Sequence, residues 1–526
     1  MNAFACSLAL SAGIAFTGPP AATERVETVL QDDAALLYRS PAQVRRSLRR
    51  MAALGVDRVR ITASWYQLAP ARDQRRRPSF DAADPNAYDR ATLGRLDRAV
   101  NGARAEGMKV MIDLGFFAPR WAVTRGGENG RNVWRPSVRE YRLYSRAMAR
   151  RYRGKVRLWT TWNEPNHRVF LRPQWVRSGD RWRPVTPHLY RRLHNAAYDQ
   201  VKAVSGRNRV LIGGLSSFGD PGRGPARGLA PLRFTRELAC VDSSLRPLRR
   251  PECRGFRALR ADGFALHPYS LDTPPDALDP AADRVQIGEL AKLTSLLAGL
   301  ERRGRVARPL PLYLTEYGYQ TDPPDPGKIS QRLAGRYQGE ALWLGWRAAR
   351  TRMFPQFLLY DIGPDRSKPA GSAARWGGYQ TGLYTYDGRP KTPVVRGFRL
   401  PFQALATRDE RGAGGVAVFG QVRPRRGTQT VEIQRQGPDG SWATVPSRPV
   451  DGDARSSCGT FATDGQGLYR RVVADQGPGR YRARWHAPGG RVQVSPPAAV
   501  GAPVAVPGGA TGALRRLADD GRAPAG

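Results

Sequence analysis

KVRLWTTWNEPN, residues 155–166, combines the pattern of a buried β-strand with an acidic residue where that strand ends. Apolar and β-branched residues favour a strand, and the helical pattern before it ends at Gly154. The strand is followed by an Asn, a Glu and a Pro. A glutamate on an ordinary surface needs no such setting, so we expect the strand to deliver the Glu164 carboxylate to a site.

The same alternation of helical and strand patterns continues from residue 41 to about residue 400. Seven further strands are predicted: ERVETVLQD (24–32), DRVRITASW (57–65), MKVMIDLGF (108–116), NRVLIGGLSS (208–217), DGFALHPYS (262–270), PLYLTEYGYQ (311–320) and FPQFLLYDI (354–362). Eight βα units predict an α/β protein with a (β/α)8 TIM barrel. The main rival, a doubly wound open sheet, lacks support because no glycine-rich phosphate loop follows an early strand.

The pattern changes after the predicted last helix, residues 392–407. Short alternating strands separated by turn residues predict a small C-terminal antiparallel β-sandwich domain. The expected division is a signal peptide at 1–22, a catalytic barrel at 23–407, the sandwich at 411–502 and a disordered tail at 503–526. The sandwich would bind glycan or support the barrel.

The N-terminus and the cysteines predict export. Residues 3–16 are apolar and precede TGPPAAT, as in a signal peptide, and this stretch is too short to span a membrane. A secreted or extracellular protein is therefore expected, with no membrane span. Cys240 and Cys253 bracket a short loop and suit a disulfide, which leaves Cys458 over. No metal site is expected at these cysteines, because no C-x-x-C pair is present.

The net charge of +40 and pI near 11.2 raise nucleic acid as a partner. The basic residues are nearly all Arg and are spread along the chain, for example in QVRRSLRRMAAL at residues 43–54. We find no nucleic-acid-binding motif, and a GC-rich genome accounts for the Arg. No nucleic-acid partner is therefore expected, although weak binding to acidic cell-envelope polymers stays open.

A second acidic residue ends another predicted strand. Glu316 follows PLYLT, and it lies 316 − 164 = 152 residues from Glu164. A closed barrel can aim both side chains at one pocket, because catalytic groups of such barrels lie at the carboxyl ends of the strands. Two facing carboxylates are what glycoside hydrolysis requires, one to donate a proton and one to attack or stabilise the anomeric carbon.

These two motifs, WNEPN and TEYG, resemble those of the clan A glycoside hydrolases, retaining TIM-barrel enzymes that include families 5 and 39. The resemblance covers about residues 24–407. It implies that Glu164 is the general acid/base, that Glu316 is the nucleophile, and that Asn163 binds the sugar 2-hydroxyl. The substrate would be an oligosaccharide or polysaccharide, and no cofactor or metal is expected.

Further residues are expected to line the pocket. By the resemblance, Arg60 would keep the nucleophile ionised, and His267 and Tyr269 would lie beside it, with Tyr269 bonding Glu316. A structural ion pair for Arg60 and a core position for His267 are the alternatives. Two tryptophans, Trp121 and Trp376, fall on predicted loops at the barrel mouth, where they could stack on sugars.

The chain also departs from the clan pattern. Its eighth strand ends in LLYDIG without the usual Trp, for which Tyr360 or Trp376 could substitute, and its third strand lacks a terminal His. The family and the sugar are therefore left open. The leading hypothesis is a secreted retaining hydrolase of β-linked glycosides. The alternatives are a non-catalytic carbohydrate-binding or cell-envelope protein on a barrel scaffold and, more weakly, a protein that binds nucleic acid or acidic polymers.

Overall fold

The computed structural model describes residues 26–501 except 128–129, 409–413, 425–426, 446–447, 450–455, 458, 475–476 and 488–489. The predicted signal peptide (1–22), the predicted tail (503–526) and Cys458 lie outside the described residues. In the part that is described, no helix has the length and apolar character needed to cross a membrane.

Eight parallel strands close into a barrel in which chain order is also spatial order. They are β1 (Glu27–Gln31), β2 (Arg58–Ala63), β3 (Lys109–Leu114), β6 (Leu158–Thr161), β9 (Arg209–Ser216), β10 (Gly263–His267), β11 (Leu312–Leu314) and β14 (Thr351–Phe357). The last strand pairs with the first, from Glu27 opposite Met353 to Gln31 opposite Phe357. The predicted TIM barrel is confirmed, and the open sheet is excluded.

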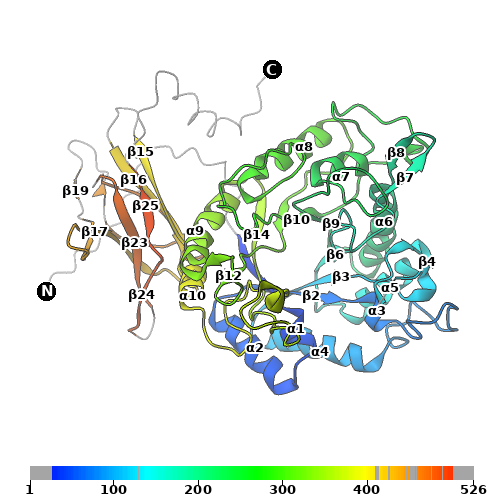
Figure 1. Cartoon of the computed structure of the whole chain (residues 1–526), viewed down its shortest axis with the longest axis horizontal. Coiled ribbons are helices and arrows are strands. Elements are labelled where there is room, and N and C mark those ends of the chain that lie inside the picture. Colours follow the sequence, from blue (N-terminus) through cyan, green and yellow to red (C-terminus); the bar gives the residue numbers. More distant parts are fainter. Residues whose placement is uncertain are drawn as a thin grey trace.

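Helices surround the barrel (Figure 1). They are α2 (Pro41–Ala53), α4 (Arg90–Ala105), α5 (Val138–Arg151), α6 (Thr186–Val204), α7 (Pro231–Leu238), α8 (Leu290–Arg302), α9 (Gln331–Arg347) and α10 (Thr392–Arg399). In α2, Ser40 and Gln43 form a reciprocal capping box ahead of the helix. Val44, Leu48 and Met51 are buried at a spacing of three or four, which places them on the face that packs inward.

Side chains from the strands fill the barrel in layers. One buried cluster takes a residue from each of seven strands: Val29, Met111, Leu158, Leu211, Ala265, Tyr313 and Met353. Two residues further along four of these strands stand Gln31, Asp113, Thr160 and His267, all buried and polar. Because side chains two apart share a face, an apolar layer lies beneath a polar one at the carboxyl ends of the strands.

Two larger antiparallel sheets and a small one of two strands follow the barrel in the described residues. One contains β15 (Phe402–Arg408), β16 (Gly414–Gln421) and β22 (Leu468–Ala474), and the other is built on β18 (Trp442–Thr444), β17 (Thr430–Gln436), β23 (Gly479–His486) and β24 (Val492–Val494). Side chains of both sheets, including Val418, Ile433 and Trp485, share one buried core. The antiparallel sandwich was therefore predicted correctly. Trp442 is only partly buried, and the Arg482 guanidinium lies over its ring.

The predicted end of the barrel domain at residue 407 is wrong. The last helix, α10, ends at Arg399, because Pro401 cannot continue a helix. The following residues form β15, where buried Phe402 and Ala404 alternate with more exposed positions. This strand pairs with β16 along its whole length, so the boundary lies near residue 400. The two parts touch where Trp343 and Trp346 of α9 pack on Phe419.

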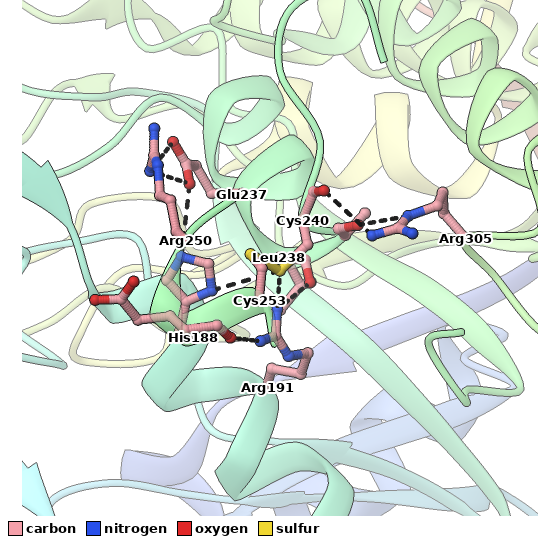
Figure 2. The surroundings of a disulfide bond; sticks show 10 residues. His188, Arg191, Glu237, Leu238, Cys240, Arg250, Cys253 and Arg305 are labelled. Carbon is pink, nitrogen blue, oxygen red and sulfur yellow. Dashed lines mark hydrogen bonds and ion pairs between the residues drawn. A yellow bond between two sulfur atoms is a disulfide. The ribbon is translucent and has the colours of Figure 1, made fainter. Parts of the chain in front are cut away.

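Cys240 and Cys253 form the predicted disulfide, which closes a short loop after α7 (Figure 2). The Arg191 guanidinium donates to the Cys240 sulfur at 3.1 Å and to the Leu238 carbonyl at 2.8 Å. From the other side, Arg305 donates to the Cys240 carbonyl at 3.2 Å. The cross-link and these arginines together fix the loop against α6.

Candidate active site

The backbone turns sharply where β6 ends and presents Glu164. Trp162 and Glu164 have φ of 65° and 38°, in the left-handed region. The turn is held from both sides, because the Glu164 N–H donates to the Gly214 carbonyl at 2.9 Å and the Trp162 N–H donates to the Leu114 carbonyl at 3.0 Å. The Trp162 ring is fully buried and works as an anchor. Strain of this kind is typical of functional sites.

Glu316 stands two residues beyond the end of β11. The neighbouring Thr315 N–H donates to the Leu266 carbonyl of β10 at 2.9 Å, which ties the two strand ends together. The side chains of Glu316 and Glu164 are 10% and 14% exposed. Both carboxylates are therefore largely shielded, yet each keeps some access to solvent.

His267, at the end of β10, brings the two carboxylates together. Its Nδ1 lies 2.9 Å from Oε1 of Glu164 and 3.5 Å from Oε2 of Glu316. One oxygen of each carboxylate and a ring nitrogen of His267 all lie within 4.8 Å of one another. The two glutamates, 152 residues apart in the sequence, therefore face one small space.

Arg60 lies fully buried beneath this space and connects its parts. One guanidinium nitrogen, Nη1, donates to Oε1 of Glu316. The other, Nη2, donates to Oδ1 of Asn163 at 2.9 Å and lies 3.4 Å from Oδ2 of Asp113. Burial opposes the charge on Arg60, but the attraction of Asp113 and Glu316 outweighs burial and raises its pKa. Arg60 therefore faces Glu316 as a permanent cation.

Asn163 and Tyr269 complete the surroundings of the pair. The Asn163 oxygen accepts from Arg60, and no acceptor is found among the described residues for its amide N–H groups, which leaves them available to a ligand. The Tyr269 hydroxyl donates to Oε2 of Glu316 at 3.2 Å. Burial raises the pKa of Tyr269 well above its ordinary value, and the charges of Glu316 and Glu164 add to the effect. Tyr269 therefore stays a neutral donor.

Asp113 was missed in the sequence, although it takes part in the site. It stands on β3 with no exposed surface, and Thr160 donates to its Oδ1 at 2.7 Å. Burial raises its pKa from 3.8 to about 6, even though Arg60 acts in the opposite direction. Gln31, which also accepts a hydrogen bond from Arg60, was missed as well. The sequence signal that could have identified both residues is a polar residue inside an otherwise apolar strand.

Tyr379, also missed, reaches the site from the long loop after β14. Its ring makes an edge contact with Phe357 at 5.3 Å, yet 54% of the residue is exposed. Burial of its hydroxyl raises the pKa of Tyr379, and the negative charges of Glu164 and Glu316 raise it further. Those charges act on the phenol only because it lies near both carboxylates.

The two tryptophans predicted to bind sugar at the barrel mouth pack against aromatic side chains of the protein. Trp121 packs on the edges of Trp65 and Phe80 at 6.3 and 5.8 Å, and its Nε1 donates to the Pro70 carbonyl. Trp376 lies 6.1 Å from the ring of Tyr386. Their roles as sugar platforms stay predictions.

In the part of the chain that the structure describes, two groups of side chains are close enough to share a cation. One is Glu164, His267 and Glu316, and the other is His188 with Cys240 and Cys253. In the second, the sulfurs are bonded to each other and offer no thiolate ligand. In the first, Arg60 already donates to Glu316. The expectation that the enzyme uses no metal stays a prediction.

The buried Asp113 should make stability depend on pH. Its carboxyl ionises near 3.8 in the unfolded chain but near 6 in the folded protein, so the folded state holds more protons between these values. The free energy of unfolding should therefore fall by about 3 kcal/mol as the pH rises through this window. Asp113→Asn cannot ionise and lacks this fall. Relative to wild type, its stability should increase from pH 4 to pH 7 in urea denaturation.

Asp113→Asn should also lose some unfolding free energy at every pH, because Asn pairs less strongly with Arg60. This constant loss would add to the pH-dependent trend. Asp73→Asn is the control, because the Asp73 side chain is 70% exposed. A difference between Asp113→Asn and wild type that is constant with pH would refute the assignment.

Comparisons with known proteins agree with the site. Residues 18–233 match the family model described as cellulase, glycosyl hydrolase family 5. The matched region spans the first five barrel strands and contains Arg60, Asn163 and Glu164, but it ends before Glu316. No curated protein matches the chain.

The fold is also similar to that of several solved structures. A family 39 glycoside hydrolase from Bacteroides cellulosilyticus WH2 is 15% identical over 86% of this chain and 81% of its own, with a TM-score of 0.47. GH5_18 from Streptomyces cattleya, in complex with GlcNAc, is 16% identical over 71% and 79%, with a TM-score of 0.43. The β-glycosidase of Thermosphaera aggregans is 14% identical over 71% and 95%, with a TM-score of 0.44.

The family match and the two facing glutamates lead to the same conclusion. The matched model describes glycosyl hydrolases, and it covers the strand that carries Glu164. This chain is a glycoside hydrolase, similar to the clan A enzymes whose motifs its sequence contains.

Proposed function

We propose that this hydrolase cleaves β-linked glycosides with retention of configuration, by double displacement. The observation that carries the proposal is the approach of Glu164 and Glu316, whose nearest oxygens lie within 4.8 Å. Retaining enzymes hold their carboxyl groups about 5 to 5.5 Å apart, whereas inverting enzymes need roughly 6.5 to 9.5 Å to admit a water. The observed approach favours direct attack by one carboxylate.

In the first step, Glu164 donates its proton to the glycosidic oxygen while a carboxylate oxygen of Glu316 attacks the anomeric carbon. The bond to the leaving group breaks and a glycosyl ester of Glu316 forms. In the second step, Glu164 removes a proton from water, the water oxygen attacks the same carbon, and the ester bond breaks. His267 lies within hydrogen-bonding distance of Glu164 and orients it for both steps.

The two glutamates have different hydrogen-bond partners. Arg60 and Tyr269 both donate to Glu316 and hold it in position as the nucleophile. The positive charge of Arg60 also balances the carboxylate after the ester is hydrolysed. The free N–H groups of Asn163, which Arg60 holds in place, can donate to the sugar 2-hydroxyl. Tyr379 offers an exposed ring beside the same space. It would take the place of the Trp that the end of the eighth strand lacks.

We further propose that the protein is exported. The apolar residues 3–16 support this, and so does the disulfide between Cys240 and Cys253, because such bonds persist in oxidising compartments. The C-terminal sandwich would act as a support for the barrel, since its Phe419 packs on Trp343 and Trp346 of α9.

The stereochemical outcome tests the mechanism. The protein should be incubated with a panel of β-glucans, xylans, mannans and aryl β-glycosides, and the anomers of the first product followed by proton NMR. Matched aryl α-glycosides serve as controls and should not be hydrolysed. We expect the β-anomer first, followed by slow mutarotation. Initial release of the α-anomer would contradict retention, and binding without hydrolysis across the panel would favour a non-catalytic carbohydrate-binding protein.

A further inference from the structure

A second hollow lies between α2 and the loop that follows β14. Its cavity measures about 240 Å³ and is lined by Arg39, Gln43, Arg46, Ser47, Arg50, Tyr360, Tyr386, Asp387 and Gly388. Drug-sized ligands occupy sites of roughly 300–1,000 Å³, so this volume suits a smaller unit. We call it the arginine pocket.

The pocket belongs to the same end of the barrel as the catalytic glutamates but is built from different side chains. Tyr360 stands three residues after Phe357, the last residue of β14. The Phe357 ring makes edge contacts with Tyr269 at 6.3 Å and with Tyr379 at 5.3 Å. The arginine pocket and the active site therefore share the chain segment that leaves β14, but no residue that lines the pocket belongs to the active site.

One face of α2 supplies the cations. Gln43, Arg46, Ser47 and Arg50 recur at the spacing of a single helical face, and Arg39 extends it just before the N-cap. Arg50 is fixed, because it donates to the Tyr360 hydroxyl at 3.1 Å and lies 4.3 Å from the centre of the Tyr384 ring. Its guanidinium is therefore held in place before any ligand binds.

The charges of this face are not neutralised within the described residues. There, Arg39 contacts only the Tyr360 ring, at 5.5 Å, and no acidic partner is found for it or for Arg46. The one acid that lines the pocket, Asp387, is already paired with Arg389 at 2.8 Å. Arg39 and Arg50 are half-buried and Arg46 is exposed, and guanidinium groups gathered without an acidic partner favour binding of a carboxylate, sulfate or phosphate.

Polar and aromatic groups beside the arginines suit a ring with hydroxyls. The Gln43 oxygen accepts from the Ser40 backbone, so its amide N–H groups remain available. Tyr386 presents a ring to the pocket and is itself flanked by Trp376 at 6.1 Å. Flat aromatic faces pack on the apolar faces of sugars. Trp376, predicted to bind sugar, thus lies beside this pocket.

We propose that the arginine pocket binds an anionic sugar unit of an acidic glycan, with Arg39, Arg46 and Arg50 holding its carboxylate or sulfate. The choice of a sugar over other anions rests on the proposed glycosidase function, whereas the choice of an anion follows from the pocket itself. The site would hold an acidic polysaccharide beside the catalytic glutamates. It also gives a specific role to part of the +40 charge.

Isothermal titration calorimetry of the full chain at 150 mM salt tests this, since salt screens attraction to the general positive charge. The probes are sodium glucuronate, glucose, inorganic phosphate and a ten-nucleotide single-stranded DNA. Arg46→Gln should weaken glucuronate binding at least about tenfold, the usual loss for one charge-assisted hydrogen bond. Glucose binding should not change. Arg39→Gln is the second variant, with the same expectation.

Arg45→Gln is the matched control, because Arg45 is an exposed neighbour on α2 that does not line the pocket. It removes the same charge and should change glucuronate binding less than twofold. Equal losses in Arg45→Gln and Arg46→Gln would overturn the proposal, as would phosphate or DNA binding more tightly than glucuronate. The readout is heat of binding, so failure here is distinguishable from failure of the proposed function, which would appear in the product anomers.

Discussion

Replacement of Glu316 by Ala is expected to lower kcat on an aryl β-glycoside by at least about 10⁴-fold, the scale of losses seen when a nucleophile is removed. The variant has no group to attack the anomeric carbon, and Arg60 loses an anionic partner. Steady-state assays on the best aryl substrate give the measurement. Glu106→Ala is the control, since Glu106 lies at the end of α4 and its one ion pair among the described residues is with the exposed Arg49.

Added azide extends this test. The truncated side chain leaves room for a small anion on the face from which Glu316 attacks, so azide should restore turnover of an activated β-glycoside and give the α-glycosyl azide. Circular dichroism must first show that the variant is folded. Wild-type rates in a folded Glu316→Ala protein would remove the nucleophile assignment, and β-glycosyl azide would place the attack on the opposite face.

The second large effect is expected for Glu164→Gln, and its size should depend on the leaving group. A general acid contributes about 10²- to 10⁴-fold where the departing oxygen needs a proton. Alkyl β-glycosides should therefore lose that much in kcat/KM, whereas a dinitrophenyl glycoside, whose leaving group departs as an anion, should lose far less in its first step. The measurement is kcat/KM across a series of leaving groups.

The choice of Gln separates a chemical role of Glu164 from a structural one. Gln keeps the shape and one hydrogen-bond acceptor for His267, so a purely structural role predicts little effect. An equal loss for every leaving group would contradict the acid/base role.

The sequence was most informative where strands end. Glu164 and Glu316 each follow a short buried strand, and the closed barrel brings such ends together whatever their separation along the chain. The positions of Arg60, His267 and Tyr269 came from the resemblance to clan A. In the structure, Arg60 and Tyr269 donate to Glu316, and His267 meets both carboxylates.

Other contributions could not be predicted from local patterns. Asp113 stands inside MKVMIDLGF, and only its contact with Arg60 shows why a carboxylate is buried there. Tyr379 belongs to a glycine-rich loop whose path depends on distant contacts, such as the buried pair of Lys391 and Asp361 at 2.9 Å. The sequence of such a loop has no helical or strand periodicity, so the position of its residues in the fold cannot be predicted from it.

The domain boundary illustrates the limit of helical periodicity. The residues after α10 fitted a continuing helix, yet Phe402 and Ala404 are buried at the period of a strand. The pairing partner of β15 is β16, which follows it after a turn. The pairing with β16 decides between helix and strand for these residues. That pairing cannot be read from the sequence of this segment alone.

The central claim is that Glu316 becomes covalently attached to the sugar. With an activated 2-deoxy-2-fluoro-β-glycoside of the best substrate sugar, hydrolysis of the glycosyl ester is slowed more than its formation. The ester should therefore accumulate. Mass spectrometry of the digested protein should then find one sugar residue on the peptide that contains Glu316 and none on the peptide that contains Glu164. Turnover of the reagent without any adduct, or an adduct on another residue, would contradict the account.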